Sequence, residues 1–103
     1  MKELKEMTCT KAGYFYLGHF RQGWLEVLLE TDHSGVSFNP NIKEPFELFK
    51  LFEVFGVDPE DGKYINDIEG RKCLVEFDEN DRVKAIYNCY LPERYSYEVR
   101  KST

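Results

Sequence analysis

The side chains that most often perform catalysis are few in this chain and do not stand in a recognised arrangement. His33 and Ser34 are adjacent in a segment that reads as a turn, and His19 lies in an aromatic stretch typical of a strand. No serine occupies the G-x-S-x-G pattern, and no glycine-rich phosphate loop occurs. A general base or a Cys–His pair would need partners that the spacing does not indicate. We therefore predict that the protein is not an enzyme and has no catalytic residues.

The three cysteines, Cys9, Cys73 and Cys89, are the other candidates for chemistry. They show no C-x-x-C spacing and each lies in a predicted strand, so we expect small buried side chains rather than a zinc or redox site. The acidic turns at 58–62 and 78–81 do not meet the calcium-loop pattern, and we expect neither a metal nor a cofactor. The odd number of cysteines and the absence of a signal-peptide pattern favour a cytoplasmic protein.

Charge is unevenly distributed along the 103 residues. The chain holds 14 basic and 19 acidic side chains, a net charge of −5. Residues 58–81 have 3 basic and 9 acidic side chains and contribute −6, whereas residues 82–103 have 5 and 2 and contribute +3. This pattern disfavours direct binding to nucleic acid, whose phosphates attract basic surfaces. One explanation of the acidic segment is a solvent-exposed surface that keeps a small protein soluble and has no binding role. The functional alternative is a patch for a partner protein of basic surface, formed by Asp58, Glu60, Asp61, Asp67 and Glu69.

The end of the chain combines tyrosines with arginines, which are residue types enriched at binding hot spots. Ordinary packing of a sheet accounts for such residues as well. In the functional interpretation the arginines hold phosphate and the tyrosines stack on a base. The corresponding ligand or interface surface consists of Tyr90, Arg94, Tyr95, Tyr97 and Arg100.

Alternating and aromatic stretches predict strands at 3–10, 14–20, 24–31, 36–38, 72–77 and 82–91, with a break at Ala12–Gly13 and a polar tail over 92–103. One helix is predicted over about 44–56, because Pro45 suits a first turn, apolar residues recur at helical spacing, and Gly56 suits the position after the last turn. Strands and helix are segregated along the chain. This arrangement predicts an α+β fold, with a mostly antiparallel sheet of five to six strands and the helix packed on it, in a single domain over 1–103.

The predicted helix has more apolar surface than one small sheet would cover, because phenylalanine recurs at Phe46, Phe49, Phe52 and Phe55. We therefore expect a homodimer, with part of the helix covered by a second subunit. The longest apolar runs fall far short of the roughly 18 residues of a membrane span, so no membrane is expected among the partners.

The stretch from Phe46 to Asn88 resembles a recurrent pattern in small phage and prophage proteins of unknown function. An apolar helix ends at Val54-Phe55-Gly56-Val57, Asn66-Asp67-Ile68-Glu69-Gly70-Arg71 follows, and the second of two strands contains Val83-Lys84-Ala85-Ile86. The resemblance implies a small accessory protein that acts by binding, inhibitors of bacterial defence systems included. The first hypothesis is therefore a non-enzymatic counter-defence inhibitor that acts by protein–protein contact through its acidic surface. The alternative is a small-ligand binder that sequesters a nucleotide-type signal.

Overall fold

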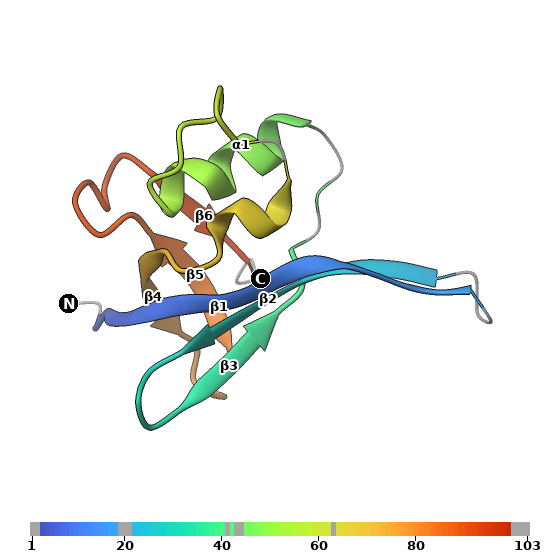
Figure 1. Ribbon diagram of the computed structural model, residues 1–103. Helices are drawn as coiled ribbons and strands as arrows, with labels where there is room; N and C mark the ends of the chain where they lie inside the picture. The colour runs from blue at the N-terminus through green and yellow to red at the C-terminus, as the bar shows by residue number, and fades with distance from the viewer. Residues whose placement is uncertain (1–2, 19–21, 41, 43–44, 63, 100–103) are drawn as a thin grey trace.

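The longest strand, β1 (Lys5–Leu17), lies in the middle of one six-stranded sheet. The computed structural model describes residues 3–18, 22–40, 42, 45–62 and 64–99. The other strands are β2 (Gln22–Glu30), β3 (Gly35–Phe38), β4 (Lys72–Phe77), β5 (Val83–Tyr87) and β6 (Ser96–Glu98). Their order is β3-β2-β1-β4-β5-β6 and all neighbouring pairs are antiparallel (Figure 1). The predicted α+β fold with a largely antiparallel sheet is confirmed.

β1 continues without interruption through Ala12 and Gly13, so the break predicted there is wrong. The register of β1 against β2 instead shifts between Cys9 and Lys11, which marks a β-bulge. Because the bulge inserts one residue, the buried side of β1 changes from the odd-numbered Met7 and Cys9 to the even-numbered Ala12. The irregular alternation in the sequence therefore reflects a shift of register within one strand.

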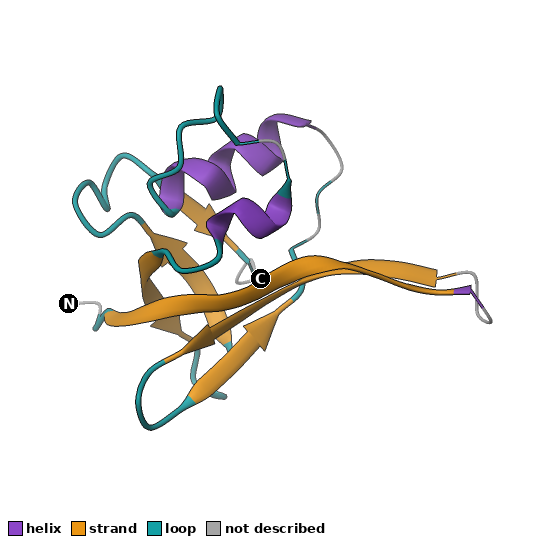
Figure 2. Cartoon of the chain, in the orientation of Figure 1, coloured by secondary structure: helices purple, strands orange, loops and turns teal. Residues whose placement is uncertain are grey.

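The helix α1 (Pro45–Val54) and the short 3-10 helix η2 (Ile65–Ile68) lie on one side of the sheet (Figure 2). After the last turn of α1, Gly56 adopts a positive φ of 75°, which glycine tolerates without strain. The N–H of Val57 donates to the Phe52 carbonyl and the N–H of Gly56 to the Glu53 carbonyl. This pattern is a Schellman motif, and it confirms the role of Gly56 expected from the sequence.

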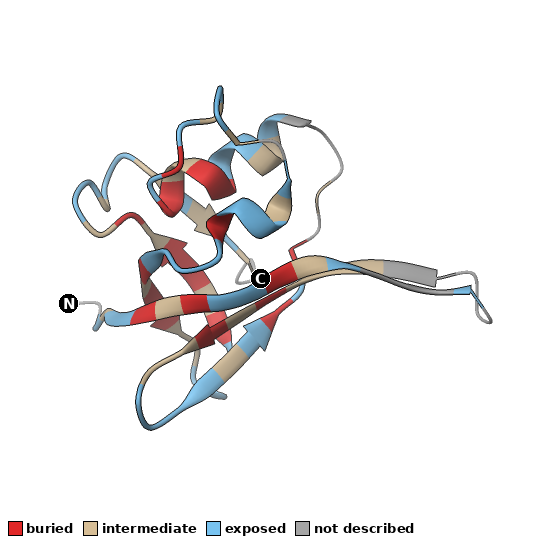
Figure 3. Ribbon diagram, viewed as in Figure 1, coloured by how far each residue is buried: buried red, intermediate tan, exposed pale blue. Residues whose placement is uncertain are grey.

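The core lies between α1 and the sheet (Figure 3). From α1 it takes Leu51, Phe52 and Val54, and from the turn directly after α1 it takes Phe55. From the sheet it takes Met7, Cys9, Ala12, Val27, Leu29, Phe38, Cys73, Val75, Val83 and Ile86. Phe46 and Phe49, nearer the start of the helix, keep 49% and 42% of their surface exposed. The fold thus covers two of the four phenylalanines that suggested a second subunit and leaves the other two accessible.

The end of the chain returns to the sheet. β5 ends at Tyr87, so it is shorter than the strand predicted over 82–91, and the backbone N–H of Asn88 donates to the Tyr95 carbonyl across the following turn. Ser96–Glu98 then pair with β5 as the edge strand β6. Part of the predicted polar tail is therefore a strand.

β1 and β2 extend beyond the rest of the sheet. β4 pairs only with Lys5–Thr8 of β1, and β3 only with Val27–Glu30 of β2. Residues 12–17 and 22–26 therefore have only each other as strand neighbours, among the strands that the structure describes. We call this two-stranded segment the arm. Figure 1 shows it extending to the right, away from α1 and from the other strands.

Candidate functional site

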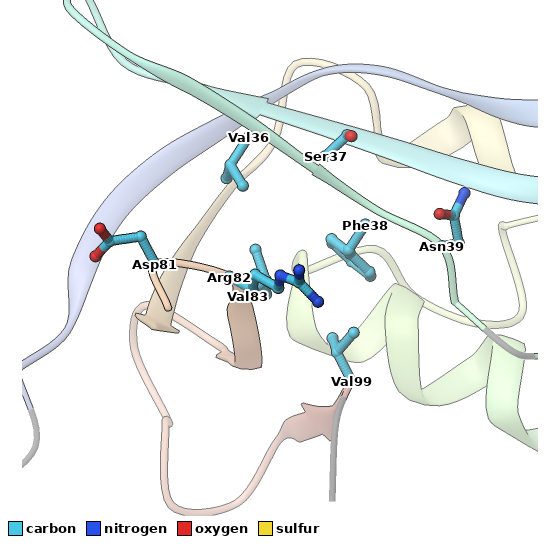
Figure 4. A pocket seen from close by; sticks show the side chains of 8 residues that line it. All are labelled: Val36, Ser37, Phe38, Asn39, Asp81, Arg82, Val83 and Val99. Atoms are coloured by element: carbon cyan, nitrogen blue, oxygen red, sulfur yellow. The ribbon is translucent and has the colours of Figure 1, made fainter. Parts of the chain in front are cut away.

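The two ends of the sheet approach each other around a cavity of about 470 Å³ between β3 and the start of β5 (Figure 4). The guanidinium of Arg82 lies over this cavity and has no hydrogen-bond or ion-pair partner among the described residues, whereas the Asp81 carboxylate points away from it. Half of the lining residues are apolar (Val36, Phe38, Val83 and Val99) and half are polar or charged (Ser37, Asn39, Asp81 and Arg82). With the Asp81 carboxylate turned away, Arg82 is the charged group that faces this cavity.

A second cavity, of about 630 Å³, lies at the C-terminal end of α1, and we call it the helix-end cavity. Among its lining residues, Lys72 is paired with Glu6 (Nζ to Oε1, 3.5 Å). The Arg71 guanidinium has no partner among the described residues, and Tyr90 is 91% exposed. Its volume is in the range of small-molecule sites. The full lining is Glu6, Phe55, Gly56, Gly70, Arg71, Lys72, Asn88, Cys89 and Tyr90.

The buried side chain of Asn88 connects the two segments that border the helix-end cavity, the end of α1 and the turn after β5. Its Nδ2 donates to the carbonyls of Glu53 (2.8 Å) and Val54 (3.3 Å) at the end of α1. Its Oδ1 accepts from the backbone N–H groups of Tyr90 (2.8 Å) and Leu91 (2.9 Å). One amide thus caps the helix carbonyls and fixes the turn that carries Tyr90.

Of the cavity-lining residues, sequence analysis singled out Tyr90 as a binding residue but missed Arg71, Lys72 and Asn88. Arg71 and Lys72 reach the cavity because β4 pairs with β1, with Lys72 opposite Thr8. The contact depends on pairing between distant segments, so no local spacing in the sequence signals it.

The acidic residues predicted as one patch lie on two elements. Asp58, Glu60 and Asp61 belong to the exposed loop 58–61 that follows α1. The Oδ1 of Asp58 accepts from the N–H of Glu60 at 2.9 Å, which shapes the loop. The carboxylates of Glu60 and Asp61 have no partner among the described residues. These two side chains are therefore available to another molecule.

Asp67 and Glu69 lie in and directly after η2, which contacts both α1 and β1. Asp67 Oδ2 accepts from the N–H of Tyr64 at 2.9 Å, and Glu69 Oε2 accepts from the N–H of Ala12 at 2.8 Å. These two carboxylates satisfy backbone donors of the fold itself, so they have a structural role beside any part in a patch.

The aromatic and basic residues of the tail have different surroundings. The Arg94 guanidinium lies 5.3 Å from the centre of the Tyr95 ring, a cation–π contact within the chain. Tyr97 pairs with Ile86 in the sheet and packs against the core. Tyr90 lines the helix-end cavity, while Arg100 and also His19 lie outside the described residues.

The three cysteines all have raised thiol pKa values. Desolvation by burial raises the pKa of Cys9 to about 12, with a further contribution from the Glu69 charge. Burial likewise raises the pKa of Cys73 and, to a smaller extent, that of Cys89, which lines the helix-end cavity. A raised pKa keeps a thiol protonated and therefore unreactive. Cys9 and Cys73 thus behave as small apolar core residues.

In the native protein at pH 8 we expect a thiol reagent such as dithionitrobenzoate to modify only Cys89, and slowly, and to modify all three cysteines after unfolding in urea. The folded thiols titrate above their ordinary value of 9.0, while the unfolded ones do not. The contribution of these thiols to the free energy of unfolding is therefore constant below about pH 9. It falls as the pH rises further, because the unfolded thiols ionise first. Rapid modification of Cys9 or Cys73 under native conditions would contradict this assignment.

Comparisons of the chain with protein-family models, with curated proteins and with solved structures found no match. Within the described part of the chain, no group of three or more His, Cys, Asp and Glu side chains is placed to hold a metal ion. None of the helices there is long and apolar enough to cross a membrane. The fold is α+β, and its candidate sites are surfaces and cavities for binding.

Proposed function

We propose that this chain is a non-enzymatic binding protein that acts by contact with another protein. The contact surface consists of the acidic loop 58–61 and the outer side of α1, by which we mean the side that carries Phe46 and Phe49. The observation that carries the proposal is the half exposure of Phe46 and Phe49 on a helix whose Leu51, Phe52 and Val54 are buried. Exposed phenylalanines are costly in water unless a partner covers them, and aromatic side chains are enriched at interfaces.

The acidic loop directly follows the helix and is held against it. Gly62, the residue after the loop, packs against the ring of Phe52, one helical turn beyond Phe49. An apolar centre with a charged rim is the usual anatomy of a protein interface. The partner that fits this surface has an apolar depression bordered by lysine or arginine side chains, whose charge would also speed the encounter.

The resemblance to small phage and prophage proteins directs the search for the partner to bacterial proteins, those of defence systems first. In this proposal the protein acts in the cytoplasm, as an inhibitor that occupies a surface of its target.

The proposal is tested by capture from bacterial lysate, followed by affinity measurement with the purified partner. We expect Phe46→Ser/Phe49→Ser to weaken binding by at least about tenfold, the equivalent of about 1.4 kcal/mol. Glu60→Lys/Asp61→Lys should slow association in low salt, because it reverses the charge of the rim.

The matched control is Glu79→Lys/Glu93→Lys, which makes the same change in net charge at two exposed positions outside α1 and outside loop 58–61. Equal loss of binding in the two charge-reversal variants would show that only the overall charge matters. Undiminished binding of the phenylalanine variant would exclude the outer side of α1 as the contact.

A second candidate function is binding of a small phosphate-bearing ligand, such as a nucleotide-type signal, in the helix-end cavity. The observation that favours it is that Arg71, whose guanidinium has no partner among the described residues, and the exposed Tyr90 line the same cavity of about 630 Å³. Arginine binds phosphate in a bidentate manner, and a tyrosine ring stacks on a base.

A panel of nucleotides at 100 times their dissociation constants should raise the unfolding midpoint, since binding then adds about 2.7 kcal/mol. Arg71→Met should abolish the rise. An unchanged midpoint across the panel would remove this candidate.

A further inference from the structure

The arm leaves backbone hydrogen-bonding groups of β1 without a neighbouring strand. The N–H of Ala12 points away from β2, because it donates to Glu69 Oε2 at 2.8 Å. Backbone directions alternate along a strand, so the N–H and carbonyl groups of Tyr14 and Tyr16 also point away from β2. Beyond Ala12 no strand that the structure describes lies on that side of β1.

The chain itself covers both edges at the base of the arm. Glu69 accepts from Ala12 on the β1 edge, and the Asn39 amide donates to the Leu25 carbonyl at 2.9 Å on the β2 edge. Farther out, the open β1 edge is 12–17, whose sequence Ala-Gly-Tyr-Phe-Tyr-Leu has no charge and no proline. Natural proteins place charged residues or proline on open edges, because an unprotected edge pairs with another strand. This edge has neither form of protection.

Two strands alone are marginally stable in water, and Tyr14 on this arm is 65% exposed. The chain has a net charge of −5, so two copies repel each other over much of their surface. The uncharged edge is a place where a second copy can approach, and the arm holds it away from the acidic loop 58–61 (Figure 1). A second copy of the same chain can therefore pair with the open backbone groups of this edge without charge repulsion, because the same uncharged segment 12–17 lies on both sides of the contact.

We propose that two copies of this protein associate through the open β1 edges of their arms, which pair antiparallel about a two-fold axis. Tyr14 and Tyr16, whose backbone N–H and carbonyl groups point away from β2, then lie opposite Tyr16 and Tyr14 of the partner subunit, and each pair exchanges two backbone hydrogen bonds. Such a contact uses the same segment on both subunits and closes at the dimer. It does not depend on the proposed function, because the outer side of α1 stays accessible.

The proposal is tested by analytical ultracentrifugation of the full chain and two variants at the same position. We expect the wild type to sediment with twice the 12.2 kDa mass of one chain. Tyr14→Pro removes the outward N–H while leaving the bonds between β1 and β2, and it should weaken dimerisation at least about tenfold. Tyr14→Val keeps the N–H and suits a strand, so it should remain a dimer.

Hydrogen exchange gives a readout that needs no variant. Within the described part of one chain, the backbone N–H groups of Tyr14 and Tyr16 have no hydrogen-bond acceptor, so we expect them to exchange slowly at high protein concentration and rapidly on dilution. A monomeric wild type would overturn the proposal, as would concentration-independent exchange of these two amides. Dimers that survive Tyr14→Pro but are lost in Phe46→Ser/Phe49→Ser would place the interface on α1 instead.

Discussion

Replacing Asn88 by alanine is expected to lower the free energy of unfolding by about 2–4 kcal/mol, because buried polar groups that lose their partners cost about 1–3 kcal/mol each and water reaches some of them. The amide serves the carbonyls of Glu53 and Val54 and the N–H groups of Tyr90 and Leu91. For a domain of this size such a loss corresponds to a decrease in the unfolding midpoint of roughly 10–25 °C. Urea unfolding followed by circular dichroism measures the change directly.

Asn88→Asp distinguishes the donor role of the amide, toward the helix carbonyls, from its acceptor role, toward the N–H groups of the turn. It keeps the oxygen that accepts from Tyr90 and Leu91 but turns a carboxylate toward the two helix carbonyls, at the negative end of the helix dipole. We expect this variant to be destabilised at neutral pH and to regain stability in acid, where the protonated carboxyl group donates a hydrogen bond. The control is the exposed Asn66→Ala, which should change stability by no more than about 0.5 kcal/mol. If Asn88→Ala were equally neutral, the amide would not organise the helix-end cavity.

The strands and the helix were predictable because their periodicity reflects which side is buried, but the bulges were not. In the pairing of β4 with β5, a register shift between Glu76 and Phe77 places both Val83 and Ile86 in the core, although strict alternation cannot bury residues three apart on one face. The same cause hid the continuity of β1 at Ala12. A bulge depends on the register of the neighbouring strand, and one sequence does not show that register.

The candidate sites were harder to predict than the elements. Tyr90 was found because its residue type is common at interfaces, whereas Arg71 reaches the same cavity only through sheet pairing. Glu69 was assigned to an acidic patch on charge alone, yet its carboxylate accepts a hydrogen bond from β1. The sequence shows which residues are charged, but tertiary contacts determine which group each carboxylate binds.

Phe52→Ala is expected to cause the largest loss of stability, about 3–5 kcal/mol, which is a large share of the roughly 5–15 kcal/mol of a typical domain. The Phe52 side chain is fully buried in the core, between α1 and the sheet. Its removal gives up the transfer energy of a phenyl ring and leaves a cavity under loop 58–61. Chemical unfolding of the variant measures the loss, and a change below about 2 kcal/mol would show that the neighbouring segments collapse into the space.

The contact of Phe52 with Gly62 makes this prediction sharper, because it couples the core to the acidic loop. An alanine Cβ at position 62 would lie 2.8 Å from Cε2 of the Phe52 ring, too close for either group to stay in place. Gly62→Ala should therefore cost about 1–3 kcal/mol in the wild type, as an overpacked core does, and much less in the Phe52→Ala background. Strict additivity of the two changes would contradict the contact. If the coupling is found, the position of Glu60 and Asp61 depends on a core ring, and Gly62→Ala should then weaken partner binding without changing any charge.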